Sequence, residues 1–256
     1  MSFRDSISSR PATIRVGRGP HAGVFTIPKA LLCNSSAYFK AALNRPFIEG
    51  QTQTIHLDDE DPSIFQTYVT WLYQGQLDSQ DIEEELDDPQ DFGLHIAEVM
   101  VFADKRDVRE LKNDAISMLL SYLVTHGLAS LDTINCVYNM PKSSEIVLLR
   151  SVLATDEVWH GHRLDKKIDH WHPEFLAEII GIYRNFKPTS RRFLESFLNT
   201  NPTTVCGFAH KHNVNAPPCS SLVKNTYTPA STPNQQPPSK KCKIEPPTQT
   251  VRVLID

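Results

Sequence analysis

Hydrophobic and polar positions between residues 12 and 77 follow short periods that are each bounded by turn or capping residues. Residues 14–16 alternate between apolar and polar side chains, as a half-buried strand does. Residues 17–23 hold three glycines and a proline, which predicts a hairpin turn, and residues 24–27 favour a second strand. Pro28 suits the first turn of a helix, so a short helix is predicted over 29–33.

Two capped helices and another strand are predicted next. Ser36 is a good N-cap, and it precedes a helix whose apolar face recurs at helical spacing. Residues 54–57 favour a strand. Asp61 followed by Pro62 is a strong helix start, and Gly75 is placed as its stop. The stripe of this helix contains Phe65, Tyr68, Val69 and Leu72.

The remaining apolar periodicity predicts helices. Residues 94–103 are apolar almost all round, which is typical of a core helix, and the next stripe runs to about residue 123. These two stripes predict two consecutive helices. Further helical stripes between 129 and 198 predict a helical extension over residues 124–200.

Composition and charge change this picture at three places. Residues 1–11 are polar and predict a flexible N-terminus without a signal-peptide core. The acidic stretch 78–91 predicts a solvated loop; a site for a divalent cation or a basic partner is the weaker alternative, because the spacing of a calcium loop is missing. Residues 201–256 hold nine of the eighteen prolines and two aromatic residues, so we expect a mostly disordered tail.

The cysteine count and hydropathy indicate an intracellular protein, cytoplasmic or nuclear. The five cysteines are scattered and odd in number, which argues against a secreted disulfide framework. No apolar run reaches about 18 residues, so no membrane segment is expected. The net charge of −4 is uninformative about nucleic acid.

Catalytic and metal chemistry find little support in the sequence. Two groups of histidine and cysteine residues, given at the end of this paragraph, are the candidates for a metal site. We expect their histidines to be structural and partly exposed instead, because neither group has the spacing of a zinc finger. Cys33 lies in a helix predicted to be buried, which favours packing over reactivity. No nucleophile elbow or phosphate loop occurs, so we expect no catalytic residue, no cofactor and no enzyme activity. The two groups are His160, His162, His170 and His172, and Cys206, His210, His212 and Cys219.

The tail contains a lysine cluster, Lys240, Lys241 and Lys243. An accessible basic cluster is what a nuclear-import signal requires. Such clusters also occur by chance, so a solubilising patch remains an equal alternative.

The first half of the chain resembles the BTB/POZ domain, and its sequence pattern is most similar to that of the BTB proteins common in fungi. The resemblance covers about residues 12–123. It implies a helical hairpin over residues 97–123, of which residues 103–105 and 110–115 match the family. It implies an α+β fold: a small mixed sheet flanked by a cluster of helices, followed here by the helical extension and the tail. Its residues are Val24-Phe25-Thr26-Ile27-Pro28-Lys29-Ala30-Leu31-Leu32-Cys33, Ser36-Ala37-Tyr38-Phe39-Lys40-Ala41-Ala42-Leu43, Phe47-Ile48-Glu49-Gly50, Ile55-His56-Leu57, Phe65 and Trp71-Leu72-Tyr73-Gln74-Gly75.

The resemblance implies that the protein binds other proteins. BTB domains self-associate through the first strand and helix, and some dock on a cullin scaffold of a ubiquitin ligase through a hydrophobic-x-Glu motif, which Phe47 and Glu49 match. Core packing of Phe47 with a solvated Glu49 is an equal alternative. Lys29 would lie at the dimer seam. The family's Asp partner is replaced by Pro11-Ala12, and its His by Pro28, which leaves homodimer formation open.

Two functions follow as hypotheses. The first is a non-enzymatic protein-interaction module that acts as a cullin ubiquitin-ligase adaptor. The second is a nuclear, transcription-associated scaffold that assembles complexes through the same domain. No zinc-finger or basic-zipper motif occurs, so direct contact with nucleic acid is not expected.

Overall fold

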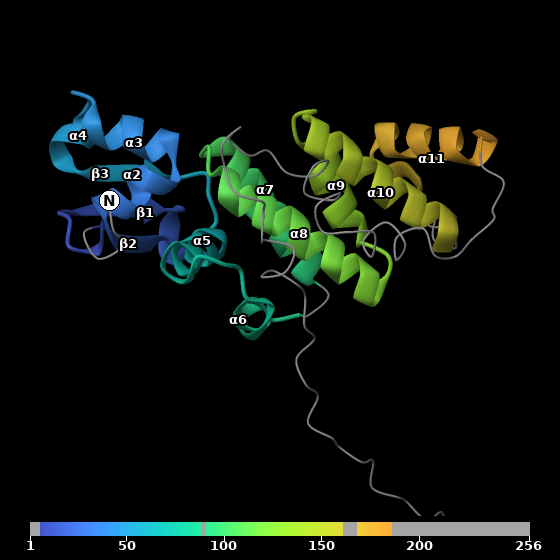
Figure 1. The fold of residues 1–256 in the computed structure, drawn as a ribbon, viewed down its shortest axis with the longest axis horizontal. Helices are drawn as coiled ribbons and strands as arrows, with labels where there is room; N and C mark the ends of the chain where they lie inside the picture. Colours follow the sequence, from blue (N-terminus) through green and yellow to red (C-terminus); the bar gives the residue numbers. More distant parts are fainter. Residues whose placement is uncertain (1–5, 89–90, 161–167, 186–256) are drawn as a thin grey trace, which may run out of the picture.

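The computed structural model describes residues 6–88, 91–160 and 168–185. A small sheet with α2 to α5 lies at one end of the molecule, α7 and α8 cross its middle, and α9 to α11 form the other end (Figure 1). One continuous hydrophobic core runs through all three parts. The predicted α+β fold, a small mixed sheet flanked by helices, is confirmed.

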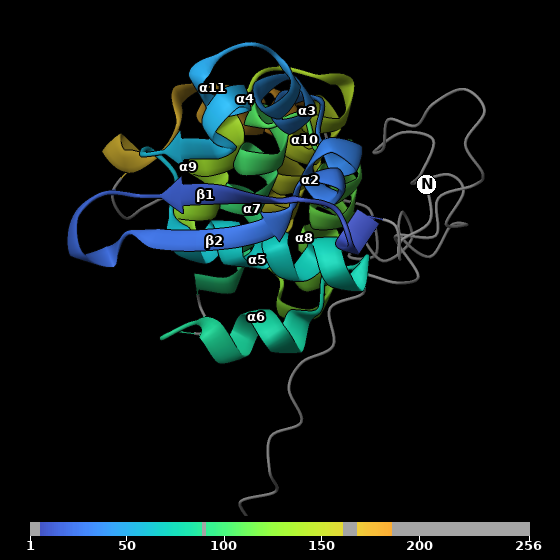
Figure 2. The same ribbon diagram turned by 90° about the vertical axis from the view of Figure 1, so that its left-hand side faces the viewer.

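The sheet contains β1 (Pro11–Val16), β2 (Gly23–Pro28) and β3 (Thr54–Leu57) in the order β2-β1-β3. β1 pairs antiparallel with β2 and parallel with β3, so the sheet is mixed. The hairpin turn contains the short 3-10 helix η1 (Gly19–His21). The central strand is the most buried, since Ile14 and Val16 are fully enclosed. Figure 2 shows β1 and β2 edge to edge on the face opposite the helical extension.

Helices α2 (Lys29–Ser35), α3 (Ala37–Asn44), α4 (Ile48–Thr52) and α5 (Pro62–Gln74) frame the sheet. The predicted caps are confirmed. The Ser36 side chain accepts a hydrogen bond from the backbone amide of Phe39, and the Asp61 side chain accepts one from the amide of Ser63. Gly75 ends α5 in the left-handed conformation. Cys33 is half-buried in α2 and packs against the core, in agreement with the packing role that was predicted for it. The short helix α4 was not predicted.

The loop predicted over residues 78–91 is wrong in part, because α6 (Ser79–Glu85) lies within it. Asp78 caps this helix by accepting the amide of Gln80 at 2.9 Å. Ile82 is buried and Leu86 packs against the core, so two apolar side chains hold the helix while its exposed carboxylates, such as Glu84, remain in water. Burial of a single apolar face is enough to order a segment that is otherwise strongly acidic.

Helices α7 (Phe92–Lys105) and α8 (Arg109–His126) form the predicted hairpin. Fourteen of their apolar side chains are at most 1% exposed, including Ile96, Met100 and Leu119. The hairpin contacts the sheet end through α5: the Trp71 indole N–H donates to Asp114 of α8 at 2.8 Å, and Phe102 lies 5.2 Å from the Tyr68 ring. An aromatic cluster therefore connects α5 with α7.

The extension contains α9 (Leu131–Asn139), α10 (Ser144–His160), the 3-10 helix η3 (Ile168–His170) and α11 (Pro173–Asn185). It packs directly on the hairpin: a Cβ at Gly93 of α7 would lie 3.2 Å from the Thr133 hydroxyl of α9. Lys112 of α8 pairs with Asp104 at 2.6 Å and with Glu145 of α10 at 3.4 Å. The first half of the chain and the extension thus share one core.

Candidate protein-interaction surface

The turn between α3 and α4 is held by two donors that converge on one carbonyl. The Lys29 ammonium reaches from the start of α2 and donates to the Leu43 carbonyl at 2.8 Å. The Gln53 side-chain amide donates to the same carbonyl at 3.1 Å. A positive charge at the carbonyl end of a helix is favourable, so these contacts fix the end of α3 and the position of α4.

Gly50 makes the tight turn sterically feasible. An added Cβ at this position would lie 2.0 Å from the Arg45 carbonyl oxygen, closer than two atoms can approach. Gln53 then ends α4 with a φ of 54°, a left-handed conformation uncommon in non-glycine residues. Only a residue without a side chain at position 50 allows α4 to fold back this closely on the end of α3.

The result is an exposed apolar pair beside a carboxylate. Phe47 is 57% exposed and Ile48 is 70% exposed at the beginning of α4, and the partly exposed Glu49 follows them. The alternative that Phe47 packs into the core is therefore wrong. Large apolar side chains at this exposure gain free energy when a partner covers them. We call Phe47, Ile48 and Glu49 the α4 surface.

Lys29 makes its described contacts within the chain, and its expected place at a dimer seam stays a prediction. Its ammonium is engaged within the chain at Leu43, and its backbone amide donates to the Arg10 carbonyl at 2.9 Å. The start of α2 is also covered locally, because the Ala30 amide donates to the Ser9 hydroxyl at 2.9 Å. The residues before β1 therefore occupy part of the α2 face in the monomer.

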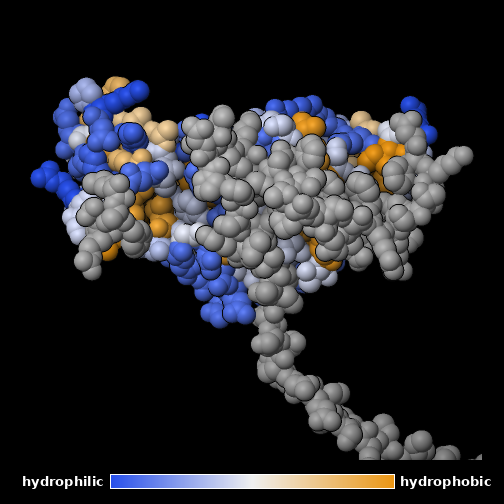
Figure 3. All heavy atoms as spheres, in the orientation of Figure 1, coloured by the Kyte–Doolittle hydropathy of each residue, from blue (hydrophilic) through white to orange (hydrophobic). Residues whose placement is uncertain are grey.

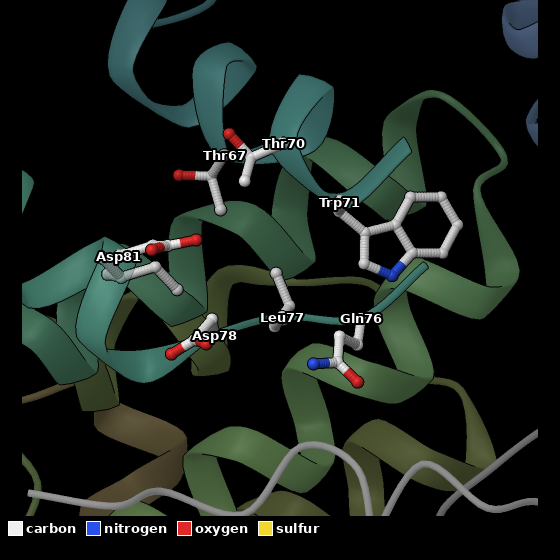
Figure 4. Close-up of a pocket in the computed structure, with 8 residues that line it drawn as sticks. Thr67, Thr70, Trp71, Gln76, Leu77, Asp78 and Asp81 are labelled. Carbon is white, nitrogen blue, oxygen red and sulfur yellow. The ribbon is translucent and has the colours of Figure 1, made fainter. Parts of the chain in front are cut away.

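Two of the hollows in the described residues are poor sites for a small substrate. The one between α5 and α6 encloses only about 10 Å³ and is lined by Thr67, Trp71, Leu77, Asp78 and Asp81 (Figure 4). Ligand pockets typically have about 300–1,000 Å³. Asp81 is already paired there with the Gln74 amide at 2.8 Å. A larger groove beside Asp104 and Glu145 is occupied at its base by the Lys112 ion pairs.

Two buried ionisable side chains, His95 and Glu145, have shifted pKa values and make contacts between helices. Burial lowers the pKa of His95 to about 4, partly offset by the charge of Asp61, and its Nε2 lies 2.8 Å from the Thr67 hydroxyl. Burial alone would raise the pKa of Glu145, but hydrogen bonds from its own amide and Ser144, with the Lys112 charge, hold it at about 2. Both groups join helices in the interior.

The candidate metal residues lie mainly outside the described part of the chain. His162 and the whole Cys206 group fall there, as does the side chain of His160. His172 has a structural contact, since its Nδ1 accepts the Glu174 amide at 3.2 Å at the start of α11. Among residues 6–88, 91–160 and 168–185, no group of three or more His, Cys, Asp or Glu side chains has the arrangement of a metal site.

Comparison with known proteins agrees with this geometry. The family model of the BTB/POZ domain matches residues 12–123. Residues 12–123 have the BTB/POZ fold. A BTB/POZ domain-containing protein of Arabidopsis thaliana is 25% identical over 117 residues, which is 46% of this chain and 14% of that protein. The chain thus spans only a small part of this relative's length.

The BTB/POZ assignment gives the α4 surface its context. BTB/POZ domains mediate protein–protein interactions, including dimerisation. Lys29 donates to the Leu43 carbonyl at the end of α3, and Phe47 and Glu49 lie at the start of α4. Sequence reasoning quoted Ile48 and Gly50 in the matching motif but assigned them no role, and it missed Gln53, whose positive φ left no sequence signal. Lys240, Lys241 and Lys243 lie outside the described residues, and no helix in the described ranges is long and apolar enough to span a membrane.

Proposed function

We propose that this protein is a non-enzymatic interaction module whose BTB/POZ domain uses the α4 surface to dock on a cullin scaffold, as a ubiquitin-ligase adaptor. The observation that carries the proposal is the pair of exposed apolar side chains, Phe47 and Ile48, presented beside Glu49 by a rigid turn. Apolar anchors next to a charge are typical of binding hot spots.

The rigidity of the turn supports this proposal. Lys29 and Gln53 hold the end of α3, and Gly50 allows α4 to lie against it. A surface that is already in its binding conformation loses little conformational entropy when a partner docks. The resemblance to fungal BTB proteins adds the hydrophobic-x-Glu motif at Phe47 and Glu49. Substrate proteins of such an adaptor would be bound by the helical extension or the tail.

Binding to a purified cullin N-terminal fragment tests the proposal. We expect Phe47→Ala to weaken binding about 30-fold or more, because loss of a hot-spot side chain costs about 2 kcal/mol or more. Glu49→Ala is expected to slow association and to reduce its dependence on salt. Val147→Ala on α10, which removes a comparably exposed side chain, is the matched control. Absence of binding, or binding indifferent to both α4 changes, would exclude the adaptor role.

A second function, a nuclear scaffold that assembles transcription-associated complexes, is favoured by Lys240, Lys241 and Lys243. A short accessible lysine cluster is the chemistry that import receptors recognise. Replacing the three lysines with glutamine in the full chain is expected to move a fluorescent fusion out of the nucleus. An unchanged distribution would leave the cluster as a solubilising patch. The location of the protein in cytoplasm or nucleus follows from the same measurement.

Self-association through β1 and α2 is a further part of the proposal. Burial of apolar surface can drive such a dimer, although the start of α2 is engaged by Ser9 and Arg10 within the chain. Sedimentation at several protein concentrations will show whether a dimer forms.

A further inference from the structure

Strand β2 forms one edge of the sheet and has a strand beside it on one side only. The strand order β2-β1-β3 places β1 next to it, and Figure 2 shows no strand of the described residues along its other side. Val24 is 59% exposed, and Thr26 is exposed as well. Figure 3 shows hydrophobic residues at the surface at this end of the molecule. The outer edge of β2 is therefore accessible to another strand.

The hydrogen bonds of β1 show which backbone groups of β2 lie on this edge. The Thr13 amide donates to the Gln53 carbonyl at 2.9 Å, and the Gly17 amide donates to the Leu57 carbonyl at 3.0 Å. Odd-numbered residues along β1 therefore direct their backbone groups toward β3. Since these groups alternate in direction along a strand, the even-numbered residues of β1 face β2. The register places odd-numbered residues of β2 opposite them.

The even-numbered residues of β2 consequently direct their backbone groups away from the sheet. A separate contact agrees, because the Lys29 amide donates to the Arg10 carbonyl at 2.9 Å and continues the same alternation past the end of β2. The amides of Val24 and Thr26 point outward and have no hydrogen-bond partner among the described residues. Pro28 adds a carbonyl and no donor. Backbone groups in this arrangement are a template for pairing with another chain.

Two properties of β2 indicate that the pairing strand is β2 of a second copy. Natural edge strands are commonly shielded by charged side chains, whereas residues 23–28 carry no charge, so two copies meet here without like-charge repulsion. The edge is also self-complementary. In antiparallel pairing about a two-fold axis, the outward groups of Val24 face those of Thr26 in the other copy, and every outward amide of both strands then has an acceptor.

We propose that two copies of this chain associate through the outer edges of their β2 strands, which joins their sheets into one. In this register the Phe25 side chains of the two copies lie directly opposite each other, in the kind of pair that brings side chains closest. Phe25 is only partly buried, with its ring 4.8 Å from that of Phe65, so the pairing covers an aromatic surface that the single copy leaves exposed. This contact is separate from self-association through β1 and α2.

Sedimentation and amide hydrogen exchange of the full chain over a series of protein concentrations test the contact. We expect a dimer to form as the concentration rises, and the amides of Val24 and Thr26, followed by NMR, to exchange at least about 10-fold more slowly in it. The amides of Phe25 and Ile27 face β1, so their exchange should not change. Exchange at Val24 and Thr26 that stays fast at every concentration would overturn the proposal. Exchange there that is slow at every concentration would also overturn it and assign the edge to a segment of the same chain.

Substitutions on β2 identify the surface that associates. Thr26→Pro removes an outward N–H and no hydrogen bond to β1, a position at which an edge strand tolerates proline; it should weaken dimer formation about 10-fold or more. Thr26→Val keeps the amide and is the matched control. Val24→Lys adds a charge to the edge without constraining the backbone and should also prevent pairing. A dimer that is indifferent to both Thr26→Pro and Val24→Lys would overturn the proposal and assign the contact to another surface.

Discussion

The buried histidine of α7 makes the stability of this protein depend on pH in a defined window. His95 is only 5% exposed, and its ring lies against the Thr67 hydroxyl of α5. Burial lowers its pKa from 6.5 to about 4 in the folded protein. Between these two values the unfolded chain binds the proton more readily than the folded one. The free energy of unfolding must therefore fall as the pH is lowered from 6.5 to 4.

The magnitude follows from the size of the shift. A pKa that falls from 6.5 to about 4 corresponds to about 3 kcal/mol, at about 1.4 kcal/mol for each pKa unit. This is a large part of the total stability of a typical domain, about 5–15 kcal/mol. Glu145, with a pKa of about 2, loses its contribution only below about pH 4.5, so the two groups act in different windows.

Urea unfolding at intervals between pH 7.5 and 4 measures this dependence. We expect the unmodified chain to lose up to about 3 kcal/mol over this range, whereas His95→Gln, which retains a polar group near Thr67, loses much less. His56 is exposed on β3, so His56→Gln should keep the full dependence. Equal slopes for the unmodified chain and His95→Gln would refute the assignment of this dependence to His95.

Two further substitutions probe the contacts that position the α4 surface and those that join the BTB/POZ region to the helical extension. Gly50→Ala places a Cβ on the Arg45 carbonyl, so we expect the free energy of unfolding to fall by about 1–3 kcal/mol and cullin binding to weaken. Gly181→Ala on α11, where a Cβ meets no atom, is the control and should be neutral or stabilising. Lys112→Met removes the ammonium that pairs with Asp104 and with the buried Glu145, and we expect a loss of about 3 kcal/mol. Lys142→Met, which removes an exposed pair, should cost less than about 1 kcal/mol. Equal effects within either pair would contradict its explanation.

The sequence by itself determined where most helices and strands begin and end. Ser36, Asp61 and Gly75 act on backbone groups within four residues of themselves, so their effect is visible locally. The stripe of α5 was equally readable, because helical periodicity depends only on spacing. The same local reasoning failed for residues 79–85, where the helix depends on the burial of Ile82 in the core.

Only the tertiary structure decided which side chains face a partner. Phe47 is apolar and was as compatible with the core as with the surface; it is exposed because Gly50 allows α4 to fold back on α3. Lys29 reaches a carbonyl 14 residues away at Leu43, and Trp71 meets Asp114 across 43 residues. Such contacts form between segments that the chain brings together only on folding. Capping and periodicity, which act over one or two helical turns, carry no information about them.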